Sequence, residues 1–138
     1  MRKVYIYDTT LRDGAQGEGI SYSVSDKIRI ANELDKFGIH YIEGGWPGSN
    51  PKDMEFYLKM SKVQLKNSNL VAFGSTCKIN TSPKDDNNIK SIIKAKTKFV
   101  TIFGKTWLLH VKEALKTTPK ENLRIIKETI SYLKSLGF

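Results

Sequence analysis

Apolar residues follow two different periods along the chain, and the switch between them is the clearest signal in the sequence. The β-branched and aromatic run 3–7 predicts a first strand that ends in a polar segment. From residue 28 to residue 37 the apolar positions follow a helical period, which predicts an amphipathic helix. Ser23 and Asp26 have capping-box spacing before it, and Gly38 follows it as a C-cap. Together these residues form a strand-then-helix unit.

The same unit recurs three more times. Further strands are expected at 40–43, 70–74 and 99–103, with helices at 50–65, around 89–93, at 110–116 and at 119–136. A strand about every 30 residues, each followed by a helix, predicts an α/β fold with a parallel sheet. A doubly wound open sheet and a barrel both satisfy this pattern, and periodicity does not choose between them. Residues 1–138 form one domain in this interpretation, and 135–138 match a helix end before a fifth strand, so we expect the chain to stop in mid-repeat.

Composition narrows the class of protein. The chain has 138 residues, 39% apolar and 27% charged, which suits one globular domain. Its apolar runs are far shorter than the roughly 20 residues needed to cross a bilayer, and no secretory signal pattern precedes the first strand. We therefore expect a cytoplasmic protein with no membrane partner. The single cysteine, Cys77, excludes an internal disulfide and is expected to be a buried small hydrophobe.

The formal charge of +9 permits nucleic acid, an anionic membrane or small acidic ligands as partners. The lysines are spread singly along helical segments, as at Lys59, Lys62 and Lys66. That dispersion is typical of a solvated surface rather than of a stripe that follows phosphates, and the sequence has no nucleic-acid motif. We therefore expect no nucleic-acid partner.

The densest polar cluster, Asp8–Gln16 (Asp-Thr-Thr-Leu-Arg-Asp-Gly-Ala-Gln), directly follows the first strand. In barrel enzymes the carboxyl ends of the strands collect the active groups. The Asp13 carboxylate is a hard oxygen ligand for a divalent cation, and the Arg12 guanidinium beside it can clamp an anionic substrate or stabilise an oxyanion. The alternative, which composition alone supports equally, is a loop salt bridge between Arg12 and Asp13 with Gly14 completing a turn.

This cluster resembles the signature of the metal-dependent TIM-barrel family that includes 2-isopropylmalate, homocitrate and citramalate synthases and hydroxymethylglutaryl-CoA lyase. Segments 41–53 and 100–107 are more similar to the citramalate branch than to the isopropylmalate branch, and the resemblance extends over essentially the whole chain. The fold that it implies is a half barrel, the first four units of a (β/α)8 barrel.

The resemblance also implies roles for single residues. Asp13 corresponds to a metal ligand, and Arg12 to the arginine that polarises the keto oxygen of a bound α-keto acid. Gln16 matches a position near the substrate, and Glu43 matches an acidic residue that helps to position the catalytic arginine. For Glu43 the alternative is a strand-end carboxylate that binds a backbone amide or a lysine.

The implied reaction is that of an acyltransferase in isoleucine or leucine biosynthesis. Acetyl-CoA, the co-substrate, loses a methyl proton and attacks an α-keto acid, and the thioester is then hydrolysed, with Mg, Mn or Zn as Lewis acid. Pyruvate as the acceptor gives citramalate, and a bulkier keto acid gives isopropylmalate or homocitrate. Thr101, which shares a strand face with Phe103, and His110 are candidate substrate-binding residues. Core packing for Thr101 and Phe103, and a structural role for His110, are the alternatives.

The chain departs from the family pattern in its metal ligands. Family members take further ligands from a His-X-His pair and an asparagine, whereas this chain has two histidines, His40 and His110, in separate units. One carboxylate does not hold a divalent cation tightly against water, so we expect an incomplete metal site and a chain that is inactive alone. A half barrel also leaves sheet edges and an inner face uncovered, which predicts a homo-oligomer or pairing with a missing barrel half.

Two other classes of function remain open on the sequence alone. One is a binding module of flavodoxin-like shape that uses Asp8–Gln16 for a cation or a phosphate. The other is a non-catalytic subunit that keeps the half barrel for assembly.

Overall fold

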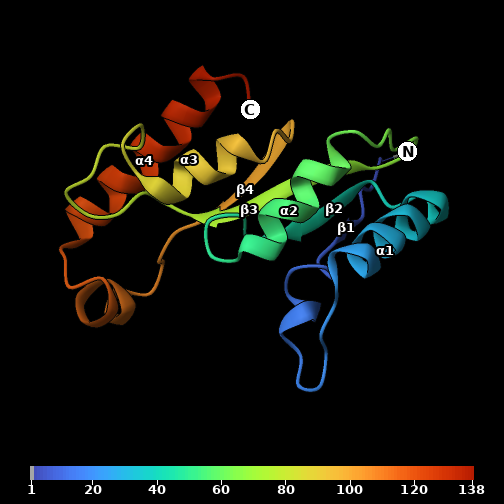
Figure 1. The fold of residues 1–138 in the computed structure, drawn as a ribbon. Coiled ribbons are helices and arrows are strands. Elements are labelled where there is room, and N and C mark those ends of the chain that lie inside the picture. The colour runs from blue at the N-terminus through green and yellow to red at the C-terminus, as the bar shows by residue number, and fades with distance from the viewer. Residues whose placement is uncertain (1) are drawn as a thin grey trace.

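The computed structural model describes residues 2–138, and it contains one four-stranded sheet in the order β1-β2-β3-β4 (Figure 1). The strands are β1 (Tyr7–Asp8), β2 (Tyr41–Gly45), β3 (Asn69–Ser75) and β4 (Phe99–Phe103). The helices are α1 (Val24–Phe37), α2 (Pro51–Met60), α3 (Asn87–Lys94) and α4 (Pro119–Ser135), with a 3-10 turn η1 (Gly14–Gln16) and a π-helical turn η2 (His110–Ala114). Every neighbouring pair of strands is parallel, which confirms the predicted α/β architecture.

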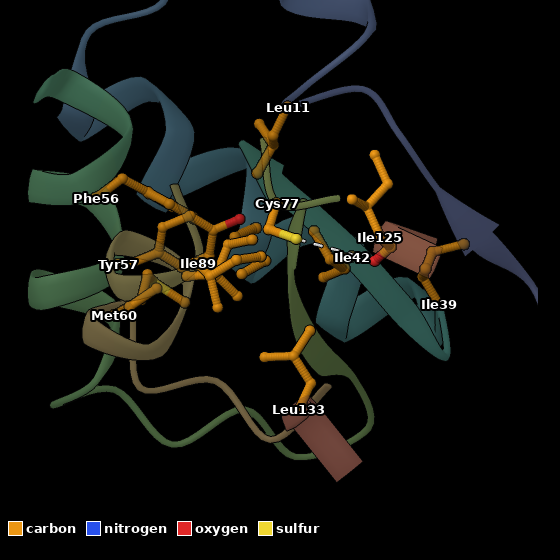
Figure 2. Packing of buried hydrophobic residues seen from close by; sticks show 14 residues of the cluster. Leu11, Ile39, Ile42, Phe56, Tyr57, Met60, Cys77, Ile89, Ile125 and Leu133 are labelled. Carbon is orange, nitrogen blue, oxygen red and sulfur yellow. Dashed lines mark hydrogen bonds between the residues drawn. The ribbon is translucent and has the colours of Figure 1, made fainter. Parts of the chain in front are cut away.

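The hydrophobic core lies between the sheet and the helices that cover one of its faces (Figures 1 and 2). Phe56 and Tyr57 of α2 and Ile92 of α3 are fully buried there, together with Ile42 of the sheet. Burying side chains of this size stabilises the fold by roughly 1.5–3 kcal/mol each. In α1 the predicted apolar stripe is only partly confirmed, because Ile28, Ile30 and Leu34 pack against the core while Phe37 is 83% exposed.

The sheet curves towards the face that the helices do not cover. Tyr7 lies on β1 and Thr101 on β4, at the two edges of the sheet, yet their hydroxyl oxygens are 2.6 Å apart. Tyr41 of β2 and Phe99 of β4, on strands that are not neighbours, also pack edge to face, with ring centroids 5.3 Å apart. A sheet whose first and last strands meet through their side chains has the curvature of a barrel wall rather than of an open sheet.

The start of α1 follows the sequence prediction in detail. Ser23 Oγ accepts a hydrogen bond from Asp26 N at 3.1 Å, and Ser23 N donates to Asp26 Oδ2 at 3.0 Å, which completes the capping box. Gly38 ends the helix in the left-handed conformation (φ 88°), where a glycine has no Cβ to clash.

The first strand is shorter than predicted, covering Tyr7–Asp8 rather than 3–7. Its single sheet neighbour, β2, begins at Tyr41, which pairs with Tyr7. Just before that point, Ile6 N donates to the imidazole Nδ1 of His40 at 3.1 Å instead of to a strand carbonyl. The carbonyl of Ile6 still accepts from Tyr41 N of β2 at 3.1 Å, but its N–H is turned to His40, so the regular pairing of β1 with β2 begins at Tyr7.

Helix α2 also ends earlier than predicted, at Met60 rather than near residue 65. The backbone N–H groups of Lys66, Asn67 and Ser68 donate to the carboxylate of Asp35 at 3.0, 2.7 and 2.8 Å. A carboxylate from α1 thus ties down the chain after α2, a long-range contact that helical periodicity cannot reveal.

The last two helical predictions had different outcomes. Helix α4 covers Pro119–Ser135, close to the predicted 119–136, whereas 110–116 is reduced to the single π-helical turn η2. Cys77 is 1% exposed, as expected, and burial raises the pKa of its thiol. Among residues 2–138, none of the helices combines the length and hydrophobicity needed to span a bilayer.

Candidate active site

The turn after β1 brings Arg12 back towards the carboxyl end of the sheet. The carbonyl oxygen of Thr9 accepts hydrogen bonds from Arg12 N at 3.1 Å and from Asp13 N at 2.8 Å. Leu11, which lies between Thr9 and Arg12 in the turn, is fully buried in the core. The anchored leucine and the shared carbonyl fix the backbone from which both charged side chains project.

Arg12 meets Glu43 at the end of the neighbouring strand. Arg12 Nε donates to Glu43 Oε1 at 2.5 Å, and Glu43 is 1% exposed. The β2–β3 register shifts between Glu43 and Gly45, and a bulge of this kind re-aims the side chains beside it. The carboxylate of Glu43 thus pairs with a guanidinium rather than with a lysine or a backbone amide.

The remaining faces of the Arg12 guanidinium have different surroundings. Its Cζ lies 4.1 Å from the centre of the Phe73 ring, a cation–π arrangement, and its Nη1 donates to Asp13 Oδ1 at 2.7 Å. The loop salt bridge considered from the sequence therefore forms, with Asp13 64% exposed at its outer end. Nη2 of Arg12 makes no hydrogen bond to the described residues, so the guanidinium keeps donors for a ligand.

Tyr7 is a member of this group that the sequence analysis missed. Its hydroxyl donates to Glu43 Oε2 and lies 2.6 Å from Thr101 Oγ1. Burial, together with the hydrogen bond to Glu43, raises the pKa of Tyr7 well above its ordinary value. The available signal was its position: Tyr7 directly precedes Asp8, at the end of the strand where the polar cluster begins.

Aromatic rings form an apolar wall beside Arg12. Phe73 and Phe103 are stacked with ring centroids 5.7 Å apart and planes at 1°, and Trp46 packs edge-on against both. Phe103 and Thr101 lie on the face of the sheet that carries Arg12, as strand alternation predicts. The hydroxyl of Thr101 is engaged with Tyr7, and Phe103 is part of the wall.

Gln16 and His110 lie further from this group. Gln16 is exposed and lines a small cavity of about 120 Å³ together with Arg12 and Trp46. His110, at the start of η2, is exposed and packs edge-on against Trp107 at 4.7 Å. Within residues 2–138 the structure brings Gln16 to the rim of the Arg12 group but leaves His110 without a hydrogen bond to it.

A buried ion pair between α1 and α2 fixes the loop that carries Trp46. Lys27 of α1 and Asp53 of α2 form a salt bridge in which the lysine side chain is 3% exposed, and Asp53 Oδ2 accepts Trp46 N at 2.8 Å. The Trp46 indole donates to Asn88 Oδ1 at 2.6 Å. Gly45 has φ 148°, and a Cβ there would overlap the Asp53 carboxylate, so this turn requires glycine. Trp46 is therefore held through both its backbone N–H and its indole.

Arg12, Asp13 and Glu43 lie together at the carboxyl end of a parallel sheet, and sequence comparison gives the family in which this arrangement belongs. A model of HMGL-like proteins matches residues 3–138. The chain belongs to the HMGL-like family. The match covers the elements described above, from the residues before β1 to the end of α4.

Several HMGL-like relatives are citramalate synthases. The chain is 62% identical over 132 residues to an (R)-citramalate synthase of Aquifex aeolicus, covering 96% of the chain and 25% of that protein. It is 53% identical over 135 residues to an (R)-citramalate synthase of Geobacter sulfurreducens, covering 98% of the chain and 26% of that protein. A 2-isopropylmalate synthase of Lactococcus lactis is more distant, at 33% over 132 residues, covering 96% and 25%. The predicted order of similarity is confirmed, and the chain spans about a quarter of the length of these relatives.

The fold agrees with that of a solved structure. A Bacillus subtilis HMG-CoA lyase superposes with a TM-score of 0.71 at 19% identity, over 97% of this chain and 43% of the lyase. Nearly all of this chain therefore superposes on less than half of the lyase. This confirms the half barrel predicted from the resemblance to the family.

The described residues do not make a complete metal site. Asp13 is a suitable oxygen donor, exposed and bound to a single partner, Arg12. Among residues 2–138, however, no three histidine, cysteine, aspartate or glutamate side chains come together as ligands. Asp13 fits as one ligand of a divalent cation, and this donor set by itself does not fit a tightly bound one.

Proposed function

We propose that this chain supplies the amino-terminal part of the catalytic barrel of an (R)-citramalate synthase, which condenses acetyl-CoA with pyruvate. The observation that carries the proposal is the Arg12 guanidinium, held by Glu43 through Nε and seated on Phe73, with Nη2 left for a ligand. Identities of 62% and 53% to citramalate synthases, against 33% to a 2-isopropylmalate synthase, support the choice of branch.

In this proposal Arg12 binds the α-keto acid. A carboxylate or keto oxygen accepts from the free N–H groups of Nη2, and these bonds strengthen as the keto oxygen becomes an alkoxide during attack by the acetyl-CoA carbanion. Glu43 positions the guanidinium by holding Nε. Phe73, Phe103 and Trp46 exclude water from the adjacent space and offer an apolar surface to the methyl group of pyruvate.

Asp13, Gln16, Thr101 and His110 take secondary places. Asp13 is proposed as one ligand of a divalent metal, Mg, Mn or Zn, whose other ligands come from residues outside this chain. Gln16 is proposed to contact the substrate from the rim of the site. Thr101 is proposed to act through Tyr7. His110 would reach the keto acid or acetyl-CoA only if the exposed segment around η2 shifted.

The uncovered surfaces support pairing with further barrel elements. Val4 and Ile6 before β1 are 73% and 50% exposed, and Leu123 and Ile130 on α4 are 66% and 42% exposed. These two sets flank opposite edges of the sheet, where a barrel would continue. We propose that they pack against the segment that corresponds to the rest of the relatives' barrel, or against a second copy of this chain when it is alone. A monodisperse species of 15.7 kDa in light scattering at high concentration would contradict the second case.

A chimeric enzyme tests the proposed activity. This chain replaces the matching 132-residue region of the Aquifex aeolicus (R)-citramalate synthase, and thiol release from acetyl-CoA is measured with pyruvate and with the keto acids that yield 2-isopropylmalate and homocitrate. We expect pyruvate to support the largest kcat/KM and the isolated chain to be inactive.

The matched control is the same replacement in the Lactococcus lactis 2-isopropylmalate synthase, which should lose most of its activity because residues on β3 and β4 would not suit a bulkier substrate. A folded Aquifex chimera that is inactive with every keto acid would defeat the synthase proposal. Full activity in the second host with the bulkier keto acid would assign the chain to the isopropylmalate branch.

A further inference from the structure

The hydroxyl of Tyr7 joins the first and last strands of the sheet at the site. It donates to the Glu43 carboxylate on β2 and lies 2.6 Å from Thr101 Oγ1 on β4. No other tyrosine in the described residues contacts Arg12 or its ion-pair partners through its hydroxyl: the Tyr57 hydroxyl lies 2.9 Å from the carbonyl oxygen of Gly45 and 2.8 Å from that of Val71, within the core. Tyr7 is thus the phenol at the centre of the Arg12 group.

The direction of each hydrogen bond follows from counting protons. An ionised carboxylate only accepts, and a phenol has one proton to donate. Because Glu43 Oε1 accepts from Arg12 Nε, the Tyr7 proton goes to Oε2, and Thr101 must donate to the Tyr7 oxygen. The result is a one-way chain from Thr101 through Tyr7 to Glu43, with Arg12 bound to the other carboxylate oxygen.

This chain leaves Glu43 little freedom. The carboxylate is 1% exposed, and each of its oxygens is occupied by a donor from a different segment, so rotation about its terminal bond would break both contacts. A side chain held in this way fixes the Nε–H of Arg12, and the planar guanidinium then fixes where Nη2 points. Tyr7 as a whole is 41% exposed, but desolvation of its hydroxyl and the hydrogen bond to Glu43 raise its pKa, which keeps the phenol protonated and able to donate.

We propose that Tyr7 is a positioning residue whose hydroxyl holds Glu43, and through it the Arg12 guanidinium, in the orientation that binds the keto acid. The hydrogen-bonded unit is a property of this chain, whereas its effect on the keto acid rests on the proposed function. The ring is a separate matter, because it stacks on Tyr41 with centroids 6.3 Å apart and would do so without the hydroxyl.

Tyr7→Phe isolates the hydroxyl, and Tyr41→Phe is the matched control. Both changes remove one oxygen from a ring on the same face of the sheet, but the Tyr41 hydroxyl makes no hydrogen bond to the described residues. The probe is the Nε–Hε signal of Arg12 in the ¹⁵N-labelled 138-residue chain. Arg12→Lys identifies this signal among those of the four arginines, Arg2, Arg12, Arg29 and Arg124.

In the unsubstituted chain we expect the Arg12 Hε proton to exchange with water more slowly than that of Arg2. Tyr7→Phe should accelerate this exchange by about tenfold, the equivalent of one hydrogen bond to a charged group, while Tyr41→Phe leaves it unchanged. Equal exchange of Arg12 Hε in the unsubstituted chain and in Tyr7→Phe would overturn the proposal.

A second measurement needs no substitution. A hydroxyl that donates to a buried carboxylate exchanges slowly enough to give its own downfield proton resonance, so the Tyr7 hydroxyl proton should be visible in the unsubstituted chain. Its absence under conditions where the Arg12 Hε signal is protected would also overturn the proposal. Tyr7→Phe therefore does not need to fold perfectly for the inference to be decided.

Kinetics of the Aquifex chimera test the functional consequence. Tyr7→Phe is expected to raise KM for pyruvate by about tenfold and to leave KM for acetyl-CoA unchanged, because Arg12 is proposed to bind only the keto acid. An inactive unsubstituted chimera with the exchange result intact would remove the proposed function but keep the hydrogen-bonded unit. An active chimera whose KM for pyruvate is unaffected by Tyr7→Phe would overturn the positioning role.

Discussion

Three ion pairs lie near the carboxyl end of this sheet, and two of them, Lys27–Asp53 and Arg12–Asp13, differ in how far their hydrogen bonds are completed. Lys27 and Asp53 join α1 to α2, with side chains 3% and 12% exposed, and the second oxygen of Asp53 is taken by Trp46 N. Arg12 and Asp13 are 20% and 64% exposed, and the guanidinium keeps N–H groups without a partner in the described residues. The first pair is enclosed, whereas the second is open.

Charges that fix the backbone are therefore distinct from charges that can bind a ligand. An enclosed pair loses hydration on folding and contributes mainly by fixing geometry, here the glycine turn before Trp46. An open pair gains little stability, because water and salt screen it. Its free donors are what a ligand can use, so the pair that matters less for the fold is the better candidate for function.

The largest expected effect comes from breaking the enclosed pair. Asp53→Ala leaves the Lys27 ammonium buried without its partner and removes the acceptor for Trp46 N. We expect the free energy of unfolding to fall by about 3–5 kcal/mol, measured by urea denaturation followed by far-UV circular dichroism.

The control is Glu33→Ala, which removes the partner of Lys36 on the exposed side of α1, where both side chains are more than 60% exposed. It should cost less than about 1 kcal/mol. Equal losses in the free energy of unfolding for Asp53→Ala and Glu33→Ala would show that the enclosed pair contributes no more to stability than an exposed one.

A smaller effect is expected at Asp35, a buried carboxylate with backbone amides in place of a cation. Burial acts to raise its pKa, but the N–H groups of Lys66, Asn67 and Ser68 outweigh burial, and the pKa of Asp35 is lowered from 3.8. The contribution of the charged form is therefore fully present above that usual pKa. It is lost as the pH falls through the lowered pKa of the folded state.

Asp35→Ala tests whether a buried carboxylate stabilises the fold through its hydrogen bonds alone, without the opposite charge that the Lys27–Asp53 pair has. At pH 7 the variant should be about 1–3 kcal/mol less stable than the unsubstituted chain, from the loss of hydrogen bonds to a buried charged group. The difference should shrink as the pH is lowered below the usual pKa. Urea denaturation of both proteins across the acid range measures it, and a difference independent of pH would show that the carboxylate charge plays no part.

The sequence predicted the features that depend on neighbouring residues. Strand 99–103 was predicted to the residue because an apolar run is bounded by polar positions, and the Ser23 capping box is set by spacing alone. Arg12 and Asp13 were found because they are adjacent and belong to the polar cluster that directly follows a strand. Each of these signals lies within a few positions of the chain.

The features that the sequence missed depend on contacts between distant segments. Lys27 and Asp53 lie 26 residues apart, and from the sequence Lys27 is one of many lysines on amphipathic helices. Tyr7 is 94 residues from Thr101, and a tyrosine in a β-like run gives no sign of where its hydroxyl binds. The first contact depends on the packing of α1 against α2 and the second on the curvature of the sheet, and local periodicity determines neither.

The smallest expected change in stability is at the open pair. Asp13→Asn removes a charge that is 64% exposed and paired only with Arg12, so the free energy of unfolding should change by less than about 0.5 kcal/mol. In the Aquifex chimera the same substitution should lower kcat with pyruvate by at least about 100-fold, because an amide is a much weaker cation ligand than a carboxylate. Glu33→Gln, equally exposed on α1, should change neither quantity. Loss of activity without loss of stability at Asp13, set against the loss of stability expected for Asp53→Ala in the isolated chain, would separate the two kinds of ion pair. An Asp13→Asn variant that unfolds as readily as Asp53→Ala would instead make the open pair part of the scaffold, and its loss of activity would then say nothing about a metal.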